Sequence, residues 1–222
     1  MRFDFHIHTK YSYDSILEPK IIVKQALRKG IKALSITDHN TIKGSFAVLK
    51  ESKQRGEKLL VVPGIEIKTN VCDIIGLFIQ EEIKSRQIYE VVDNIKDQGG
   101  LVALPHPYSR GRKPSKELIA KIDLIEVFNG RATEHENRQA LTLFEKTHKG
   151  ITAGSDAHFA FELGKVNLIM PFSSESIDEY EIRKTLLNPS NLIIEGKESG
   201  ILTHVLSFSV EMGKRLVNKL VR

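Results

Sequence analysis

Short aliphatic and β-branched runs alternate with amphipathic segments along this chain, and that alternation limits its fold more than any other feature. The runs predict β-strands over residues 2–6, 33–37, 59–66, 71–79, 100–104, 124–128, 150–153, 166–170 and 192–195. Apolar residues at helical spacing predict helices over residues 18–28, 43–54, 85–97, 133–146 and 176–187. Repeated strand–helix units favour a parallel sheet with right-handed crossovers. One exception is expected at Lys68-Thr69-Asn70, which joins two strand runs and indicates a β-hairpin.

Histidine, aspartate and glutamate stand at the ends of most predicted strands. Residues i and i+2 of a strand point to the same face, so His6 with His8, and Asp156 with His158, can each aim two side chains at one point. The other polar residues at strand ends are Asp38, His39, Glu66, His106, Glu126 and Asn129. In a β/α barrel the C-terminal ends of the strands form one face, where the loops carry catalysis. We therefore expect these side chains to converge on one pocket.

Some of these residues have more than one role open to them. A single histidine in a strand is more often a hydrogen-bonded core residue than a ligand, but the joint set is hard to explain in that way. Asp38 could instead orient the loop of the neighbouring histidine. Glu126 could be a ligand, a hydrogen-bond acceptor for a ligand or a core partner for a basic residue, and the sequence does not separate these roles. The remaining histidines are expected in solvent or in packing: His135, His148 and His204.

The type of ligand indicates the chemistry. Imidazole and carboxylate together suit Zn, Mn or Fe(II), and the lack of a cysteine cluster argues against a structural thiolate zinc site. About six to eight ligands are too many for one ion and fit two or three. A carboxylate such as Glu66 can bridge two ions, which is typical of hydrolases that activate water between metals.

Five sequence motifs together resemble the PHP (polymerase and histidinol phosphatase) superfamily over about residues 1–170. The motifs are His6-Ile7-His8-Thr9 with Asp14, Ile36-Thr37-Asp38-His39-Asn40-Thr41, Pro63-Gly64-Ile65-Glu66-Ile67, His106-Pro107 and Gly154-Ser155-Asp156-Ala157-His158. The segment 125–131, with Asn137 after it, also resembles stand-alone members of that family. The resemblance implies a distorted (β/α)7 barrel that holds up to three metal ions and hydrolyses phosphate esters.

Carried over position by position, the resemblance implies three ion sites. Its ligand sets are His6, His8, Glu66 and Asp156 for one ion, Asp14, His39 and His158 for a second, and Glu66 with His106 for a third. The residues expected to be catalytic are Glu66, His106, Asp156 and His158. Many relatives carry a histidine where this chain has Asp73. Asp73 could therefore be a third-site ligand, which is the role we expect, could support one, or could leave that site weak.

A phosphate substrate needs cations beside the metals. The candidate cations are Arg110, Arg112 and Lys113, then Arg131, with Lys10 in the first loop, and each could instead be an exposed loop cation. Ser12, in the same first loop, is a further candidate for binding the substrate. The net charge of +5 is compatible with an anionic substrate. We expect a small phosphomonoester or nucleotide as substrate. A nuclease is the main alternative, although the chain has no Trp and only a few tyrosines near the site for stacking on bases. A non-catalytic metal-binding module and a C–N hydrolase are the others.

The bulk properties indicate one soluble domain. With 222 residues, 41% of them hydrophobic, we expect a single barrel domain over 1–200 and a helix over 201–222 with one buried apolar side. That helix could close the barrel bottom or form a dimer contact. The single Cys72 excludes an internal disulfide and fits a reducing compartment. We expect a cytoplasmic protein, because the chain has no apolar run of membrane-spanning length and no signal-peptide pattern at Met1-Arg2-Phe3-Asp4.

Overall fold

The computed structural model describes residues 1–56, 59–172 and 177–220. Its strands are β1 Arg2–Ile7, β2 Ile31–Ile36, β3 Leu60–Lys68, β4 Asp73–Leu77, β5 Leu101–Leu104, β6 Leu124–Asn129, β7 Gly150–Gly154, β8 Val166–Ile169 and β9 Ile193–Gly196. Its helices are α1 Pro19–Arg28, α2 Lys43–Gln54, α3 Ile88–Asp97, α4 Lys116–Lys121, α5 Glu134–Thr147, α6 Glu179–Leu187 and α7 Ile201–Leu220. The predicted starting residue of the 176–187 helix and the last two residues of the predicted 201–222 helix lie outside the described residues.

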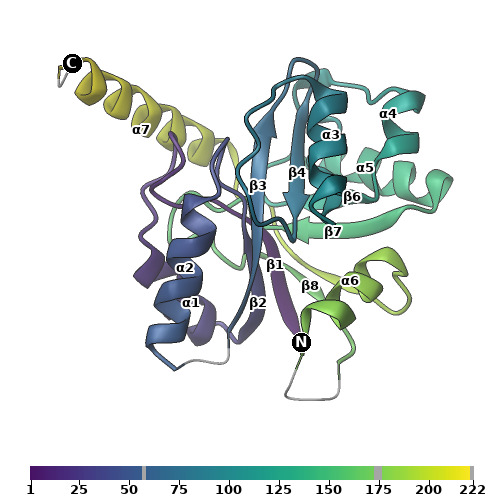
Figure 1. Cartoon of the computed structure of the whole chain (residues 1–222), viewed down its shortest axis with the longest axis horizontal. Helices are drawn as coiled ribbons and strands as arrows, with labels where there is room; N and C mark the ends of the chain where they lie inside the picture. The colour runs from purple at the N-terminus through teal and green to yellow at the C-terminus, as the bar shows by residue number, and fades with distance from the viewer. Residues whose placement is uncertain (57–58, 173–176, 221–222) are drawn as a thin grey trace.

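The strands form one sheet that curls into a nearly closed barrel, with helices on its outside (Figure 1). The sheet order is β7-β6-β5-β4-β3-β2-β1-β8-β9. The loop after β7 meets β1, where Ile7 pairs with Ala157 and the His8 N–H donates to the Ala157 carbonyl over 2.8 Å. Gly154 makes this approach close, because a Cβ there would lie 2.4 Å from the His6 Cβ. The contact confirms the barrel-type α/β fold. It also places the first motif, with His6 and His8, beside the last motif, with Asp156 and His158.

Strand direction follows the prediction in most of the sheet and departs from it near the C-terminus. β1, β2 and β3 are parallel, as are β5, β6 and β7. The predicted hairpin is confirmed, since β4 runs antiparallel to β3. The extension of the parallel pattern to the last two strands is wrong: β8 is antiparallel to β1, and β9 to β8. A parallel crossover needs a connection of about a dozen residues or more, usually a helix, and the link over 155–165 between β7 and β8 contains no helix, so the chain turns straight back into β8.

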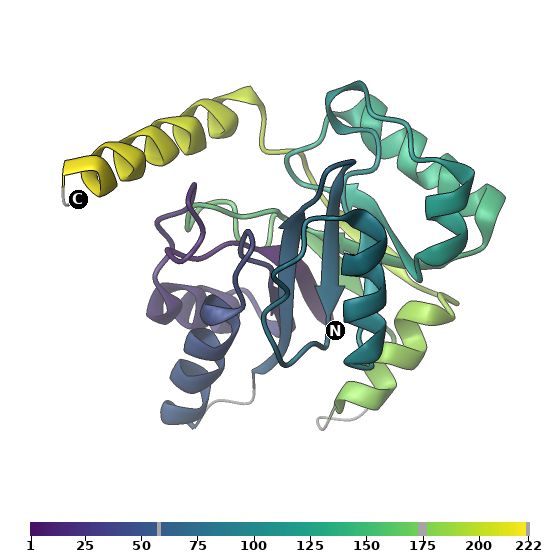
Figure 2. The same cartoon turned by 45° about the horizontal axis from the view of Figure 1, so that its top comes forward.

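The helix α7 lies at the end of the barrel where β1 ends, and it extends beyond the body of the molecule (Figures 1 and 2). It therefore does not close the barrel bottom. Among the side chains of this helix that the structure describes, Thr203 and Ser207 are buried, whereas Leu202 is 69% exposed and Phe208 62% exposed. In the single chain, hydrogen bonds hold the polar side of the helix against the barrel, so burial of the apolar side in a dimer contact stays a prediction. No described helix combines the length and apolarity needed to cross a bilayer.

Candidate metal centre

Side chains from five strand ends and one loop meet at the C-terminal end of the barrel. The residues come from the end of β1 (His6, His8), the loop after it (Asp14), the loop after β2 (His39), β3 (Glu66), the end of β5 (His106) and the loop after β7 (Asp156, His158). His6, His8 and Glu66 are almost fully buried, while Asp14 and Asp156 keep a little exposure at the pocket. The predicted convergence on one pocket is thus what the geometry shows.

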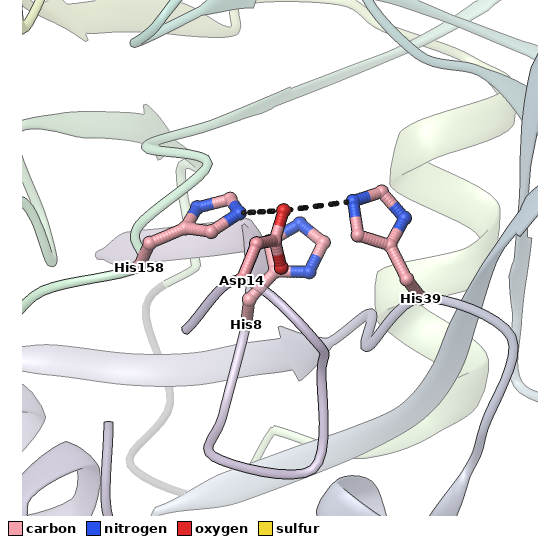
Figure 3. Close-up of side chains that lie close together, drawn as sticks. All are labelled: His8, Asp14, His39 and His158. Atoms are coloured by element: carbon pink, nitrogen blue, oxygen red, sulfur yellow. Dashed lines mark hydrogen bonds and ion pairs between the residues drawn. The ribbon is translucent and has the colours of Figure 1, made fainter. Parts of the chain in front are cut away.

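One group consists of His8, Asp14, His39 and His158, called the tetrad below (Figure 3). Asp14 lies between two histidines, with its Oδ2 atom 3.0 Å from His158 Nε2 and 3.4 Å from His39 Nε2. One donor atom from each of the four residues lies within 4.8 Å of the others. Asp14 belongs to an irregular loop, so its position depends on how that loop is held.

Two further groups adjoin the tetrad through shared histidines. In the first, the Glu66 carboxylate spans His6 and His106, with Oε2 3.3 Å from His6 Nε2 and Oε1 3.0 Å from His106 Nε2. In the second, Asp156 Oδ1 lies 3.2 Å from His8 Nε2 and 3.5 Å from His6 Nε2. Because His6 and His8 each belong to two groups, the donors form one continuous centre.

The donor set fits bound divalent ions. Atoms that share an ion at bond lengths of about 2.0–2.2 Å lie roughly 3 Å apart, which is the spacing found here. The Nε2 atoms of His6 and His8 face each other at 3.1 Å, an arrangement that an ion between ring nitrogens stabilises. Among the described residues, the buried Nδ1 atoms of His8 and His106 have no hydrogen-bond partner. Imidazole and carboxylate donors in this ratio suit Mn, Zn or Fe(II).

The charges of the centre are strongly coupled. Burial would lower the pKa of His8, but Asp156 and Glu66 outweigh it and raise that pKa to about 10. Burial is likewise outweighed at His106, where Glu66 raises the pKa to about 9. Burial would raise the pKa of Glu66, yet His39 and His6 hold it well below its usual range. The Glu66 carboxylate is therefore ionised, and protons on His8 and His106 balance negative charge in the centre.

Glu126 and Asn129, at the end of β6, support the centre from behind. Glu126 Oε1 lies 2.8 Å from His6 Nδ1, and Oε2 accepts from the backbone N–H of His106 over 2.7 Å. The Asn129 amide donates to Glu126 and, over 3.3 Å, to Asp156. Of the three roles open to Glu126, the geometry selects the hydrogen-bond acceptor that orients a neighbouring histidine.

Asp38 has the loop-orienting role. Its carboxylate accepts from the Thr9 backbone N–H over 2.5 Å and from the Thr9 hydroxyl over 2.6 Å. Gly44 leaves room for it, since a Cβ there would lie 1.7 Å from an Asp38 oxygen. Asp38 thereby fixes the chain just after His8.

Backbone strain marks two of the donor positions. His106 has φ 27° and Asp156 has φ 51°, in the left-handed region that residues with a Cβ rarely adopt. Such strain persists where the surroundings enforce it, and it gathers at functional sites.

Two buried carboxylates that support the centre escaped the sequence prediction. Asp4 accepts from the Ser155 N–H and hydroxyl and from the Gly164 N–H, and burial raises its pKa to about 6. Asp4 lies two residues before His6 on the same strand face, and this spacing could have predicted its supporting role. Glu162 accepts from the His158 N–H over 2.9 Å, and no strand or motif pattern indicates it.

The predicted substrate-binding residues divide into two sets. Arg110, Arg112 and Arg131 line the cavity of about 400 Å³ above the metal centre, together with Asp73. Lys10 pairs with Glu18 outside this cavity, and the Ser12 hydroxyl donates to Asp14 over 2.7 Å rather than facing the cavity.

Asp73 lies at the cavity but outside the three donor groups found among the described residues. Its carboxylate pairs with Arg112 over 2.6 Å. Arg131 is also engaged, because its guanidinium binds Glu162 and two groups of α7.

The sequence profile of the PHP domain matches residues 4–197. This chain belongs to the PHP domain family. The PHP chain is 44% identical over 142 residues to an uncharacterized protein of Methanocaldococcus jannaschii, MJ1587, covering 58% of this chain and 82% of that one. The predicted family is thus confirmed.

The fold of the PHP chain is similar to that of a two-domain protein from Bacteroides vulgatus, described as containing a predicted PHP-like metal-dependent phosphoesterase. The two share 20% sequence identity with a TM-score of 0.71, over 89% of this chain and 65% of that one. The PHP chain thus spans a little under two thirds of that neighbour's length.

A shorter stretch of the PHP chain is 37% identical over 67 residues to a 5'-3' exoribonuclease, Rnm, of Salmonella typhimurium. That match covers 30% of this chain and 22% of the exoribonuclease.

Proposed function

We propose that this PHP protein is a metal-dependent phosphoesterase that hydrolyses a small phosphomonoester or nucleotide. The observation that carries the proposal is the continuous set of imidazole and carboxylate donors under a cavity lined with arginine. Hydrolysis of a phosphate ester requires side chains that bind metal ions and cationic side chains that bind the anionic phosphate. Both kinds of side chain lie at the same end of the barrel.

Three ion positions follow from the three donor groups. The tetrad would hold one ion, His6 with His8 and Asp156 a second, and His6 with Glu66 and His106 a third. The last two groups share the Nε2 atom of His6, which can serve only one ion at a time, so the other ion would be held by the remaining histidine and carboxylate of its group. The bound ions would lower the pKa of a water molecule and offset negative charge on the phosphoryl group.

The protein's own groups would bind and orient the ester. The Arg112 guanidinium, 28% exposed in the cavity, could bind a phosphate oxygen through N–H donors. Its ion pair with Asp73 holds it in place, so we propose that Asp73 orients Arg112 rather than acting as the ligand expected from the sequence. Arg110 lines the same cavity and would accommodate the second charge of a monoester.

A nuclease activity is the second candidate, and the partial match to an exoribonuclease favours it. The cavity wall is mainly polar and charged. Tyr13 lies against His39, with ring centroids 4.8 Å apart, so its ring already stacks within the centre. A strand of several nucleotides needs successive stacking surfaces, which favours the small substrate.

One assay panel tests the proposal. Protein reconstituted with Mn, Zn or Fe(II) is offered an aryl phosphomonoester, an aryl phosphodiester, nucleotides, histidinol phosphate and single-stranded oligonucleotides. Release of phosphate from monoesters or nucleotides is expected, with little cleavage of oligonucleotides. Preferred cleavage of oligonucleotides would select the nuclease. No turnover of any phosphate ester under any metal would reject both and leave the C–N hydrolase or the binding module.

A further inference from the structure

The polar side of α7 contacts the loop that carries Asp14 directly, and it is linked to the loop that carries His158 through Arg131. One loop, over residues 9–15, carries Asp14, and the other, after β7, carries His158. In Figures 1 and 2, α7 passes along the same end of the barrel as these loops. The helix lies beyond the segment that carries the family motifs, so nothing in those motifs accounts for it.

The first contact is made by Lys214. Its ammonium group donates to three backbone carbonyls of the Asp14 loop, at 2.9 Å to Lys10, 2.6 Å to Ser12 and 2.5 Å to Ser15. Three donors and three acceptors exhaust the hydrogen-bonding capacity of an ammonium group. Lys214 therefore ties residues on both sides of Asp14 to one point.

The second contact runs through Arg131 and Glu162. Arg131 donates to the Thr203 carbonyl over 2.6 Å and to the Ser207 hydroxyl over 2.8 Å, which attaches it to α7. It also donates to Glu162 over 3.1 Å, and the other Glu162 oxygen accepts from the His158 N–H over 2.9 Å. The Arg131 and Glu162 side chains are 6% and 0% exposed, so water competes little for these bonds.

We propose that α7 is a clamp that sets the geometry of the tetrad, with Lys214 and Arg131 as positioning residues for the ion bound there. The proposal rests on the metal centre of the proposed function. Asp14 and His158, whose donor atoms lie 3.0 Å apart, belong to segments 144 residues apart in the chain. The clamp fixes one segment through Lys214 and the other through Arg131 and Glu162. The group of His6, Glu66 and His106 is instead supported by Glu126.

This difference makes the effect of the clamp specific to one site. Groups that orient metal ligands typically change metal affinity by about 10–100-fold when they are removed. Loss of the Lys214 ammonium should therefore weaken the tetrad ion by roughly that factor and leave the ion of the Glu66 group unchanged. A role in overall stability alone would weaken all ions together or none.

The experiment is a calorimetric titration of metal-free protein with Mn, followed by competition with a chelator. His158→Ala and His106→Ala identify the binding steps of the tetrad and of the Glu66 group. The test variant is Lys214→Met, which keeps a long side chain without the charge, and Lys214→Arg is the conservative variant. Lys219→Met is the matched control, since Lys219 is an exposed lysine of the same helix. Arg131→Met tests the second contact by metal affinity, which a role in substrate binding would not change.

We expect the tetrad step to weaken in Lys214→Met and in Arg131→Met, to recover mostly in Lys214→Arg, and to match wild type in Lys219→Met. The His106-dependent step should stay within about twofold throughout. An unchanged tetrad step in Lys214→Met, or equal weakening of all steps, overturns the clamp. Fewer than two ions bound by the wild type would instead overturn the metal centre itself, and the clamp with it.

Discussion

Metal binding should expel protons from this protein. In the metal-free state His8 and His106 have pKa values raised to about 10 and about 9, because Asp156 and Glu66 outweigh the effect of burial. Near neutral pH both rings therefore carry a proton in the place where an ion would sit. An ion needs the free ring nitrogen, so each proton must leave as the ion binds.

The cost of this exchange follows from the two pKa values. One pKa unit corresponds to about 1.4 kcal/mol, so at about pH 7.5 removing the protons costs roughly 3 kcal/mol at His8 and about 2 kcal/mol at His106. Release of these two protons should make the affinity of the whole centre rise at least roughly 100-fold per pH unit until the pH nears about 9. The His6 proton adds to this dependence, because Asp156 and Glu126 outweigh burial and hold the pKa of His6 well above its usual value.

The assay is calorimetric titration with Mn between about pH 6.5 and 8.5, repeated in buffers that differ in ionisation enthalpy. The dependence of the heat on the buffer counts the protons, and the slope of log affinity against pH must give the same number. Release of less than one proton per loaded centre, with affinity independent of pH, would refute the coupling between the carboxylates and the histidines.

The stability of the metal-free protein should fall as the pH rises, because the same two histidines lose their protons. Both histidines have folded pKa values above the unfolded value of 6.5, so their contribution is present in full below about pH 6.5. It is lost as the pH rises through about 9 and about 10. The melting temperature of metal-free protein should therefore fall across that range, whereas the loaded protein, whose rings bind metal, should lack this dependence.

Three further predictions concern single residues. Asp156→Ala and His158→Ala should each lower turnover by orders of magnitude while circular dichroism shows an intact fold, and wild-type turnover in either, with metal replete, would contradict their assignment as ligands. Arg112→Met should raise KM for a phosphomonoester much more than for a phosphodiester, because the diester lacks the second charge; equal losses on both would indicate a positioning role. Asp73→Asn should leave the metal content unchanged and raise KM several-fold, since it frees Arg112 from its 2.6 Å ion pair; loss of one ion by elemental analysis would show that Asp73 is a ligand.

The sequence by itself determined the features that depend on short-range geometry. His6 and His8 lie two residues apart at the end of a strand, and the period of two predicts that both face the same side. Polar residues after successive parallel strands must meet at one barrel end, which was enough to bring Glu66 and His106 to a single pocket. The hairpin at Lys68-Thr69-Asn70 followed equally from local turn chemistry.

Only the tertiary structure decided which distant groups meet. Asp14 contacts His158 across 144 residues, and Lys214 reaches the carbonyl of Ser12 across 202 residues. The spacing of residues along the sequence does not predict such pairs, because a hydrogen bond between distant segments depends on where the barrel closes and how its loops turn. The same holds for α7. Its sequence pattern predicted an amphipathic helix, but the bonds from Lys214 to backbone carbonyls and from Arg131 to the helix hold its polar side against the barrel.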